Sequence, residues 1–389
     1  MIHVTDDQRR ARLATRHALA PSSRVDSVEA ATEAMTVLHA TEPATVYLSS
    51  WARVNSVSIA DVDRALYTDR TLVKQLAMRR TLFVFPRELL PAVLPSSSER
   101  VAAVERARLA SDVEAVGLAA NGDDWLDEAR AAVLETLDAA PEGLTALELR
   151  KAVPMIDVTV KPPRGNPWSA PRLLIQLGVA GDIVRGTNTQ HWRVSRPRLT
   201  RMRRWLGNEP VRLDAAAGYR EIVRRYLYSF GPCTEADIVW WLGATKGIAR
   251  AALASLDAVA VSLDGGDVGW LLPDDLADVA LPGPWAALLP VLDPTPMGWQ
   301  FRDFYLAPHS DSIFEYRGNA GTTAWVDGRV VGAWAQDAAG VVRVHILSDV
   351  TEAGRAALER EAERLTEWLG GERVGSIYVS PAMKDAAAL

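Results

Sequence analysis

A helix-start pattern that occurs three times at nearly equal spacing limits most strongly how this chain can fold. A hydroxyl residue is followed three positions later by an acid at Ser58–Asp61, Thr145–Glu148 and Thr234–Asp237, so the starts lie 87 and 89 residues apart. The hydroxyl can accept a hydrogen bond from the first helical turn, and the acid can bond back to the start. Such repetition favours a tandem array of one unit over a parallel α/β sheet, which would need crossover connections.

The surroundings of the three starts repeat as well. Each start follows an apolar helical stretch and precedes two short helices and a β-type tail, at residues 80–86, 180–194 and 258–273. We expect hairpin turns in the last two tails, at Gly186-Thr187-Asn188 and Asp264-Gly265-Gly266. Helix, short helix, helix and a two-stranded wing describe a winged helix-turn-helix, with its last helix in the DNA major groove. The pattern predicts three of them, starting near residues 24, 123 and 215.

After about residue 275 the sequence becomes β-rich. Asp327-Gly328 joins two strand-like runs and is a strong hairpin signal. Residues 342–347 and 374–380 are expected to be further strands, and 352–369 form an amphipathic helix. The chain is therefore predicted to be α+β, with three tandem winged helices and a small β-barrel-like domain. The expected domains are 1–115, 116–206, 207–275 and 276–389.

Charge is distributed unevenly along the chain. The net charge is −6, yet the segment 161–206 holds ten Lys or Arg residues and one acid, Asp182. This segment is therefore +9, which leaves about −15 for the rest. A protein with this balance would accept DNA along one stripe and repel it elsewhere, although a merely solvated basic face remains an alternative.

The second repeat places its expected recognition helix, residues 169–177, and its wing inside the basic stripe. Trp168 and Trp192 lie nearby and are expected to fill the core. The residues expected to contact DNA are Arg79, Arg80, Arg172, Arg185, His191, Arg193, Arg201, Arg203 and Arg204.

Other features exclude several classes of protein. The single cysteine, Cys233, rules out intrachain disulfides and a Cys-rich zinc site, and no metal or organic cofactor is expected. The N-terminus lacks a signal-peptide core, and no stretch approaches the ~20 apolar residues of a membrane span. We therefore expect a cytoplasmic protein that does not enter the membrane.

Five segments together resemble the bacterial winged-helix DNA glycosylases, the AlkZ- and YcaQ-like group. They are HATEPATVYLSSWARV, DRTLVKQLAMRRTLFVF, YLYSFGPCTEADIVWWLG, LLPVLDP and GTTAWVDGRVVGAW, and the resemblance covers nearly the whole chain. It implies three winged helices and a β-barrel around duplex DNA. For active members it implies hydrolysis of the N-glycosidic bond of alkylated or crosslinked purines.

One departure from this family falls on its catalytic motif. Active relatives carry Gln-x-Gln or Gln-x-Asp before a Glu-Pro, whereas this chain has His39-Ala40-Thr41 before Glu42-Pro43. Cleavage passes through a sugar cation, so a site must stabilise charge and position or activate water. The expected base or water-positioning group is His39, helped by Thr41 and Glu42. Equally, Thr41 can be the N-cap of the next helix and His39 a core residue. Phe83 and Arg80 also replace residues common in the relatives.

Two functions from different classes follow. The leading hypothesis is a monofunctional DNA glycosylase, acting as a monomer on double-stranded DNA with alkylated or crosslinked purines. The alternative is a non-catalytic winged-helix protein that recognises DNA structure or regulates transcription. No P-loop, nucleophile elbow or metal-spaced His pair supports another hydrolase.

Overall fold

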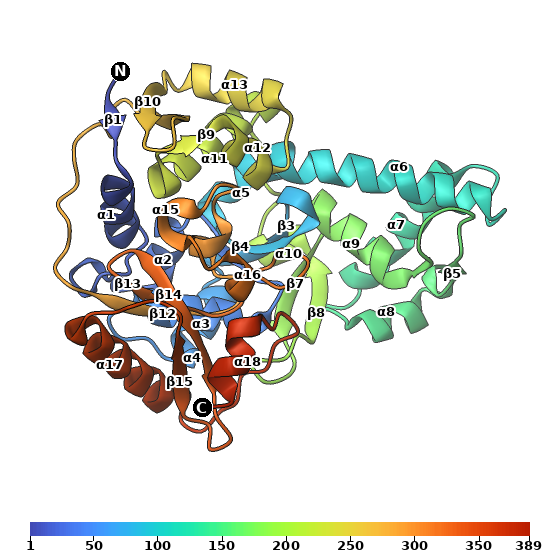
Figure 1. Cartoon of the computed structure of the whole chain (residues 1–389). Helices are drawn as coiled ribbons and strands as arrows, with labels where there is room; N and C mark the ends of the chain where they lie inside the picture. Colours follow the sequence, from blue (N-terminus) through green and yellow to red (C-terminus); the bar gives the residue numbers. More distant parts are fainter. The chain divides into compact units, whose positions relative to one another are not determined.

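The computed structural model describes all 389 residues and has an α+β fold. It consists of two compact units, which Figure 1 shows coloured along the chain. One, here called the split unit, contains residues 1–63 and 220–389; the other, the middle unit, contains residues 64–219. This division is coarser than four consecutive domains. None of the helices is both long and apolar enough to cross a membrane.

All three capping boxes form as predicted. The Thr145 N–H donates to Glu148 Oε2 at 2.7 Å, and the Glu148 N–H donates to Thr145 Oγ1 at 3.3 Å. The same reciprocal bonds join Ser58 to Asp61 and Thr234 to Asp237. These boxes begin the short helices α4 (Ile59–Asp63), α8 (Ala146–Ala152) and α12 (Glu235–Leu242). Four consecutive residues are enough to determine each start, because both hydrogen bonds are local.

The middle unit contains the second repeat in the expected order. Helices α7 (Gly122–Asp138), α8 and α9 (Ala170–Ala180) precede the hairpin of β7 (Ile183–Asn188) and β8 (Pro197–Arg201). The predicted apolar face of α7 is buried in the core of this unit. The other elements of the middle unit are η2 (Arg64–Thr68), β3 (Leu72–Leu76), η3 (Met78–Arg80), β4 (Leu82–Pro86), η4 (Arg87–Leu89), α5 (Leu90–Val93), η5 (Leu94–Ser98), α6 (Glu99–Ala115), η6 (Pro154–Ile156), β5 (Thr159–Val160), β6 (Trp168–Ser169) and α10 (Met202–Leu206).

The third repeat has the same order. It runs through α11 (Ala215–Phe230), α12 and α13 (Lys246–Ser255) to a hairpin of β10 (Val259–Leu263) and β11 (Val268–Leu271). The short strands β1 (His3–Val4) and β9 (Cys233–Thr234) extend this hairpin to the order β1-β10-β11-β9. The split unit also contains, near the N-terminus, α1 (Asp6–Arg16), η1 (Pro21–Ser23), α2 (Val28–Ala34), β2 (Leu38–His39) and α3 (Pro43–Arg53). Three short helices follow the third repeat: α14 (Pro294–Met297), α15 (Asp303–Leu306) and α16 (Ser310–Ile313).

Two of the three predicted hairpin turns are present. Strands β10 and β11 flank residues 264–267, and Asp327 and Gly328 take φ angles of 47° and 81° between two paired strands. The turn predicted at 186–188 is wrong, because Gly186 lies inside β7. A Cβ there would come within 3.0 Å of the Trp205 ring and 3.1 Å of the Arg198 carbonyl oxygen. Glycine in a strand interior often marks a bulge or a close approach, and the pairing of β7 with β8 is irregular between Arg185 and Asn188.

The C-terminal strands form an open antiparallel sheet. Strands β12 (Ala286–Leu289), β13 (Thr323–Val326), β14 (Arg329–Gln336) and β15 (Val342–Ile346) pair in chain order, so β12 and β15 are its edges. The predicted helix α17 (Glu352–Leu369) covers one side, and α18 (Pro381–Ala387) contacts β14 and β15.

The strand predicted at residues 374–380 is absent. Side chains take the backbone donors that a neighbouring strand would need: Gln336 Oε1 accepts from the Val374 N–H at 2.9 Å, and Ser376 Oγ accepts from the Tyr378 N–H at 3.0 Å. Side-chain bonds of this kind compete with a sheet ladder. We call residues 374–380 the C-terminal loop.

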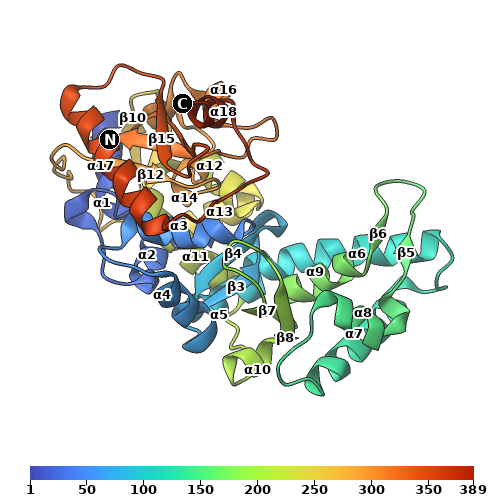
Figure 2. The same ribbon diagram turned by 90° about the horizontal axis from the view of Figure 1, so that it is seen from below.

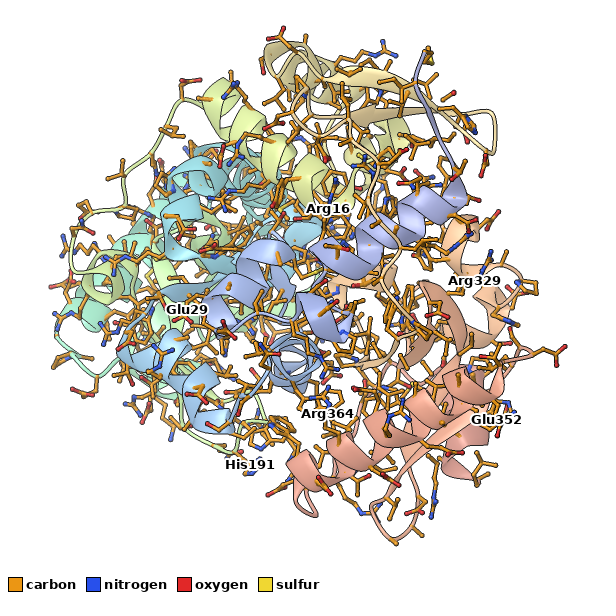
Figure 3. All side chains as sticks on the ribbon, turned by 90° about the vertical axis from the view of Figure 1, so that its left-hand side faces the viewer. Arg16, Glu29, His191, Arg329, Glu352 and Arg364 are labelled. Carbon is orange, nitrogen blue, oxygen red and sulfur yellow. The ribbon has the colours of Figure 1, made fainter.

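Helix α3 is anchored at its C-terminal end by a buried ion pair. The Arg53 guanidinium donates to both carboxylate oxygens of Asp293, at 2.8 and 2.7 Å, and neither side chain is exposed. Ser49 Oγ and the Thr295 N–H also donate to Asp293. On the other side of α3, the Arg364 guanidinium of α17 lies 3.7 Å from the centre of the buried Trp51 ring (Arg364 is labelled in Figure 3). These contacts hold rigidly the helix that begins immediately after Glu42.

Candidate active site

The His-x-Thr triplet lies between strand β2 and helix α3. His39 is the last residue of β2 and is half-buried, whereas Thr41 is exposed. His39 Nδ1 accepts a hydrogen bond from the Thr41 N–H at 3.4 Å. The triplet therefore forms a tight connection into α3, and His39 is neither fully buried in the core nor part of a helix.

Glu42, and not Thr41, occupies the N-cap position of α3. Its backbone is extended and its side chain makes no cap hydrogen bond. Instead, Glu42 Oε1 accepts from Ser376 Oγ at 3.3 Å and from the Ile377 N–H at 3.4 Å. The N-cap expected at Thr41 is thus wrong, because the proline at N1 places the cap one residue before it. The carboxylate is free of the helix and is oriented by the C-terminal loop.

The phenol of Tyr378 is near this carboxylate. Burial raises the pKa of Tyr378, and the nearby charges of Glu42 and Glu315 raise it further. Ile377 is 83% exposed although its backbone contacts Glu42. We call His39, Thr41, Glu42, Ser376, Ile377 and Tyr378 the Glu42 cluster. Sequence reasoning missed its last three members, because it assigned them to a strand.

The two replaced positions near η3 have structural partners. Phe83 is buried in β4 and packs edge-on against Phe85, with ring centres 6.0 Å apart. Arg80 is exposed, and its Nη1 donates to the two carboxylate oxygens of Glu105 at 3.2 and 3.1 Å. Arg79 is exposed and adopts a φ of 53°.

Several arginines of the basic stripe are neutralised inside the middle unit. Arg172 of α9 donates through Nε to the same Glu105 carboxylate at 3.0 Å. At the C-terminal end of α7, Arg201 and Arg203 bond the Asp138 carboxylate at 3.2 and 2.8 Å, and Arg204 bonds its carbonyl oxygen. Cations are favourable at this end because the helix dipole is negative there. Through these hydrogen bonds and ion pairs, the arginines link α9 and α10 to α6 and α7.

The remaining stripe residues differ in exposure. His191 is exposed, and its Nδ1 accepts from Arg193 Nε at 3.2 Å. Lys161 and Arg164 are exposed on the loop between β5 and β6, which projects away from the helices of the middle unit (Figure 2). Arg185 is half-buried, and burial lowers the pKa of its guanidinium. Trp168 and Trp192 are both buried, as predicted, and Trp168 Nε1 donates to Asp112 at 2.9 Å.

Comparisons with known proteins identify the fold and the family of the chain. The family model described as DNA glycosylase AlkZ-like matches residues 32–368. Among solved structures, the DNA glycosylase AlkZ of Streptomyces sahachiroi superposes with a TM-score of 0.77, at 20% identity, over 96% of this chain and 99% of that one. No curated protein matches in sequence. The solved structure shows a shared fold, and the family model extends over most of the chain: the protein belongs to the AlkZ-like DNA glycosylase family.

Proposed function

We propose that this protein is a DNA glycosylase that hydrolyses the N-glycosidic bond of alkylated or crosslinked purines in double-stranded DNA. Family membership supports the reaction class. The observation that carries the proposal to this chain is the Glu42 carboxylate, which the C-terminal loop holds next to the altered motif. A carboxylate fixed by protein donors is preorganised to stabilise a developing positive charge.

In this proposal Glu42 has the central role. As the glycosidic bond breaks, positive charge develops on the sugar and the departing purine takes the bonding electrons. Both loop hydrogen bonds go to Glu42 Oε1, which leaves Oε2 to face the sugar and to accept a proton from the attacking water. An alkylated purine is already a good leaving group, so one carboxylate with a positioned water is sufficient machinery.

His39 and Thr41 act as positioning residues beside it. Because His39 Nδ1 accepts the Thr41 N–H, a neutral imidazole carries its proton on Nε2. In that tautomer Nε2 can donate a hydrogen bond to water or to the base, but it cannot accept a proton. This favours Glu42 over His39 as the general base, with the Thr41 hydroxyl as a second contact for water.

The test is base excision under single-turnover conditions. Purified protein is incubated with duplex DNA that carries N7-methylguanine, and released base and alkali-labile abasic sites are quantified. We expect Glu42→Gln to lower the excision rate by at least about 10²-fold, the typical contribution of a general base, with nearly unchanged DNA affinity. His39→Ala is expected to lower the rate less.

A matched control is available on the neighbouring helix α2. Glu33→Gln makes the same chemical change at an exposed position, and we expect wild-type excision. If Glu42→Gln excised at the wild-type rate, the role assigned to Glu42 would be wrong.

We also infer that the three repeats act as winged helices and that exposed cations provide the DNA contacts. The expected contacts are Arg79, His191, Arg193 and Arg204, together with Lys161 and Arg164. Arg80, Arg172, Arg201 and Arg203 already have carboxylate partners, and Arg185 is half-buried, so these five residues are not expected to contact DNA.

Salt dependence tests this surface. Replacing Lys161 and Arg164 with Gln should reduce the slope of log K against log salt by about 0.9 for each DNA phosphate that the variant no longer neutralises. Arg201→Gln is the control, because its guanidinium bonds Asp138, and it should leave the slope unchanged. Equal slopes for all three proteins would contradict the placement of DNA on the β5–β6 loop.

The alternative is a non-catalytic member of the family that recognises DNA structure or regulates transcription. The replacement of the usual glutamines by His39 and Thr41 is the observation that favours it. Wild-type protein that binds damaged duplex but releases no base would support this alternative. A cytoplasmic monomer without a cofactor fits either function and remains part of the proposal.

A further inference from the structure

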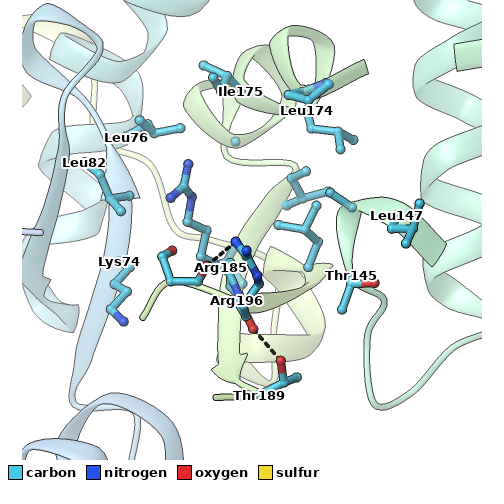
Figure 4. Close-up of a pocket in the computed structure, with 18 of the residues that line it drawn as sticks. Lys74, Leu76, Leu82, Thr145, Leu147, Leu174, Ile175, Arg185, Thr189 and Arg196 are labelled. Carbon is cyan, nitrogen blue, oxygen red and sulfur yellow. Dashed lines mark hydrogen bonds between the residues drawn. The ribbon is translucent and has the colours of Figure 1, made fainter. Parts of the chain in front are cut away.

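A cavity of about 720 Å³ lies within the middle unit. Its wall is built from the β3–β4 hairpin, helices α8 and α9, and the β7–β8 hairpin. Figure 4 shows Arg185 and Arg196 in the middle of the cavity, with leucine and isoleucine side chains around them. Cavities of this size are typical of sites for small organic ligands.

The lining combines apolar surface with positive charge. Leu76, Leu82, Leu174, Ile175 and Ile183 contribute to the apolar wall. The charged lining residues are Lys74, Arg150, Arg185 and Arg196, and no acid is among the lining residues. A ligand that fits this cavity therefore has an apolar body and a negative charge.

Arg185 differs from the other three cations. Lys74 donates to Tyr67 Oη at 2.6 Å, Arg150 pairs with Asp157, and Arg196 donates to the Ser195 carbonyl oxygen at 3.2 Å.

For Arg185 the structure gives no ion pair, and burial lowers its pKa with no nearby acid to raise it. Partial desolvation of a cation is unfavourable where no opposite charge offsets it. An anion in the cavity would remove this cost through a charge-assisted, two-pronged contact with the guanidinium.

We propose that this cavity binds a small amphipathic organic anion, with its carboxylate, sulfonate or phosphate on Arg185 and its apolar body against the leucines of β3, β4 and α9. Binding of this anion does not require that the protein excises bases. A backbone phosphate of DNA fits the site less well, because protein–DNA interfaces are polar and wet, whereas this wall is mainly aliphatic.

The probe is the fluorescent anion 8-anilinonaphthalene-1-sulfonate, titrated into the full-length protein. We expect saturable binding of one equivalent, displacement by decanoate and no displacement by decanol, which has the same chain length without the charge. Arg185→Gln should weaken binding at least about tenfold, the effect of removing one charge-assisted pair of hydrogen bonds. Arg185→Lys keeps the charge without the fork and should weaken it less.

Arg203→Gln is the matched control, since Arg203 is outside the cavity and pairs with Asp138. Thermal melting verifies that each variant is folded before titration. Equal affinity of wild type and Arg185→Gln, or displacement of the probe by decanol as well as by decanoate, would overturn the proposal. Displacement by a short undamaged DNA duplex would assign the cavity to DNA and would overturn it too.

Discussion

Two arginines, one in each unit, have opposite surroundings. Arg53 of the split unit is completely buried and donates to both oxygens of Asp293, to the Ser49 carbonyl oxygen and to Thr295 Oγ1. Arg185 of the middle unit is half-buried and lines a cavity that has no acid among its lining residues. The contacts of Arg53 are those of a structural group, whereas Arg185 has the surroundings expected of a group that binds an anion.

In this chain, the presence or absence of a carboxylate partner distinguishes structural arginines from arginines that can bind a ligand. Sequence alone ranks Arg185 above Arg53 as a site residue, because it belongs to the basic stripe. Three arginines of that stripe, however, have carboxylate partners as Arg53 does: Arg172 pairs with Glu105, and Arg201 and Arg203 pair with Asp138. A cluster of positive residues in the sequence therefore does not show how many of their charges are available to bind DNA.

The largest expected effect on stability comes from removing Arg53 from its ion pair with Asp293. Arg53→Met leaves the Asp293 carboxylate buried without its counter-charge, which costs about 3–5 kcal/mol of unfolding free energy. Urea titration followed by circular dichroism measures it. The double variant Arg53→Met/Asp293→Leu should recover much of the loss, because no uncompensated charge remains. A loss below about 1 kcal/mol in the single variant would show that the pair is not structural.

The second effect is a pH dependence produced by the same network. His17 is fully buried, donates to the Ser229 carbonyl oxygen and contacts Thr295 Oγ1 at 3.0 Å. Burial and the charge of Arg53 lower its pKa from 6.5 to about 3. Below pH 6.5 the unfolded chain therefore binds a proton that the folded protein does not, so stability falls as the pH drops toward 3.

Between pH 7 and pH 5 this amounts to about 2 kcal/mol. Asp293 adds nothing in this window, because Arg53 and the hydrogen bonds outweigh burial and hold the pKa of its carboxyl below its usual value. Urea midpoints across the range measure the effect, and His17→Gln should flatten the profile. If His17→Gln kept the wild-type dependence of stability on pH, a group other than His17 would be its cause.

A third prediction compares the same capping box in the two units. In the split unit, Thr234 and Asp237 are buried, and Asp237 also accepts the backbone N–H groups of Gln300 and Phe301. In the middle unit, Thr145 and Glu148 are near solvent. We expect Thr234→Ala to cost about 2 kcal/mol and Thr145→Ala about 1 kcal/mol, because water can replace the missing hydrogen bonds only at Thr145. Equal losses in thermal or urea unfolding would argue against the role of burial.

The smallest effect on stability is expected for a substitution of Arg185. Arg185→Met replaces a desolvated cation by an apolar chain of similar length, so stability should stay within about 1 kcal/mol of wild type or rise. The measurement is the urea midpoint without added ligand. A loss as large as that of Arg53→Met would reveal a structural partner for Arg185 and remove the contrast between the two arginines.

Local features of this protein could be predicted from sequence because their interactions are local. The three capping boxes each need only four consecutive residues, and the Asp327-Gly328 turn needs two residues that tolerate positive φ. The apolar face of α7 likewise follows from helical periodicity. The candidate triplet at His39 could be located by resemblance to the family.

Long-range contacts decided the rest, because their partners are far apart in the chain. Glu42 meets Ser376 across 334 residues, Arg53 meets Asp293 across 240, and Arg172 meets Glu105 across 67. The same holds for Gly186, which lies in a strand paired with β8 although local preference indicates a turn, and which leaves no room for a side chain beside Trp205. Local sequence therefore predicted the starts of the three helices with capping boxes and two of the three hairpin turns. Only the tertiary structure decided which charges are paired and which carboxylate is held at the site, since pairing depends on the distance between side chains in space.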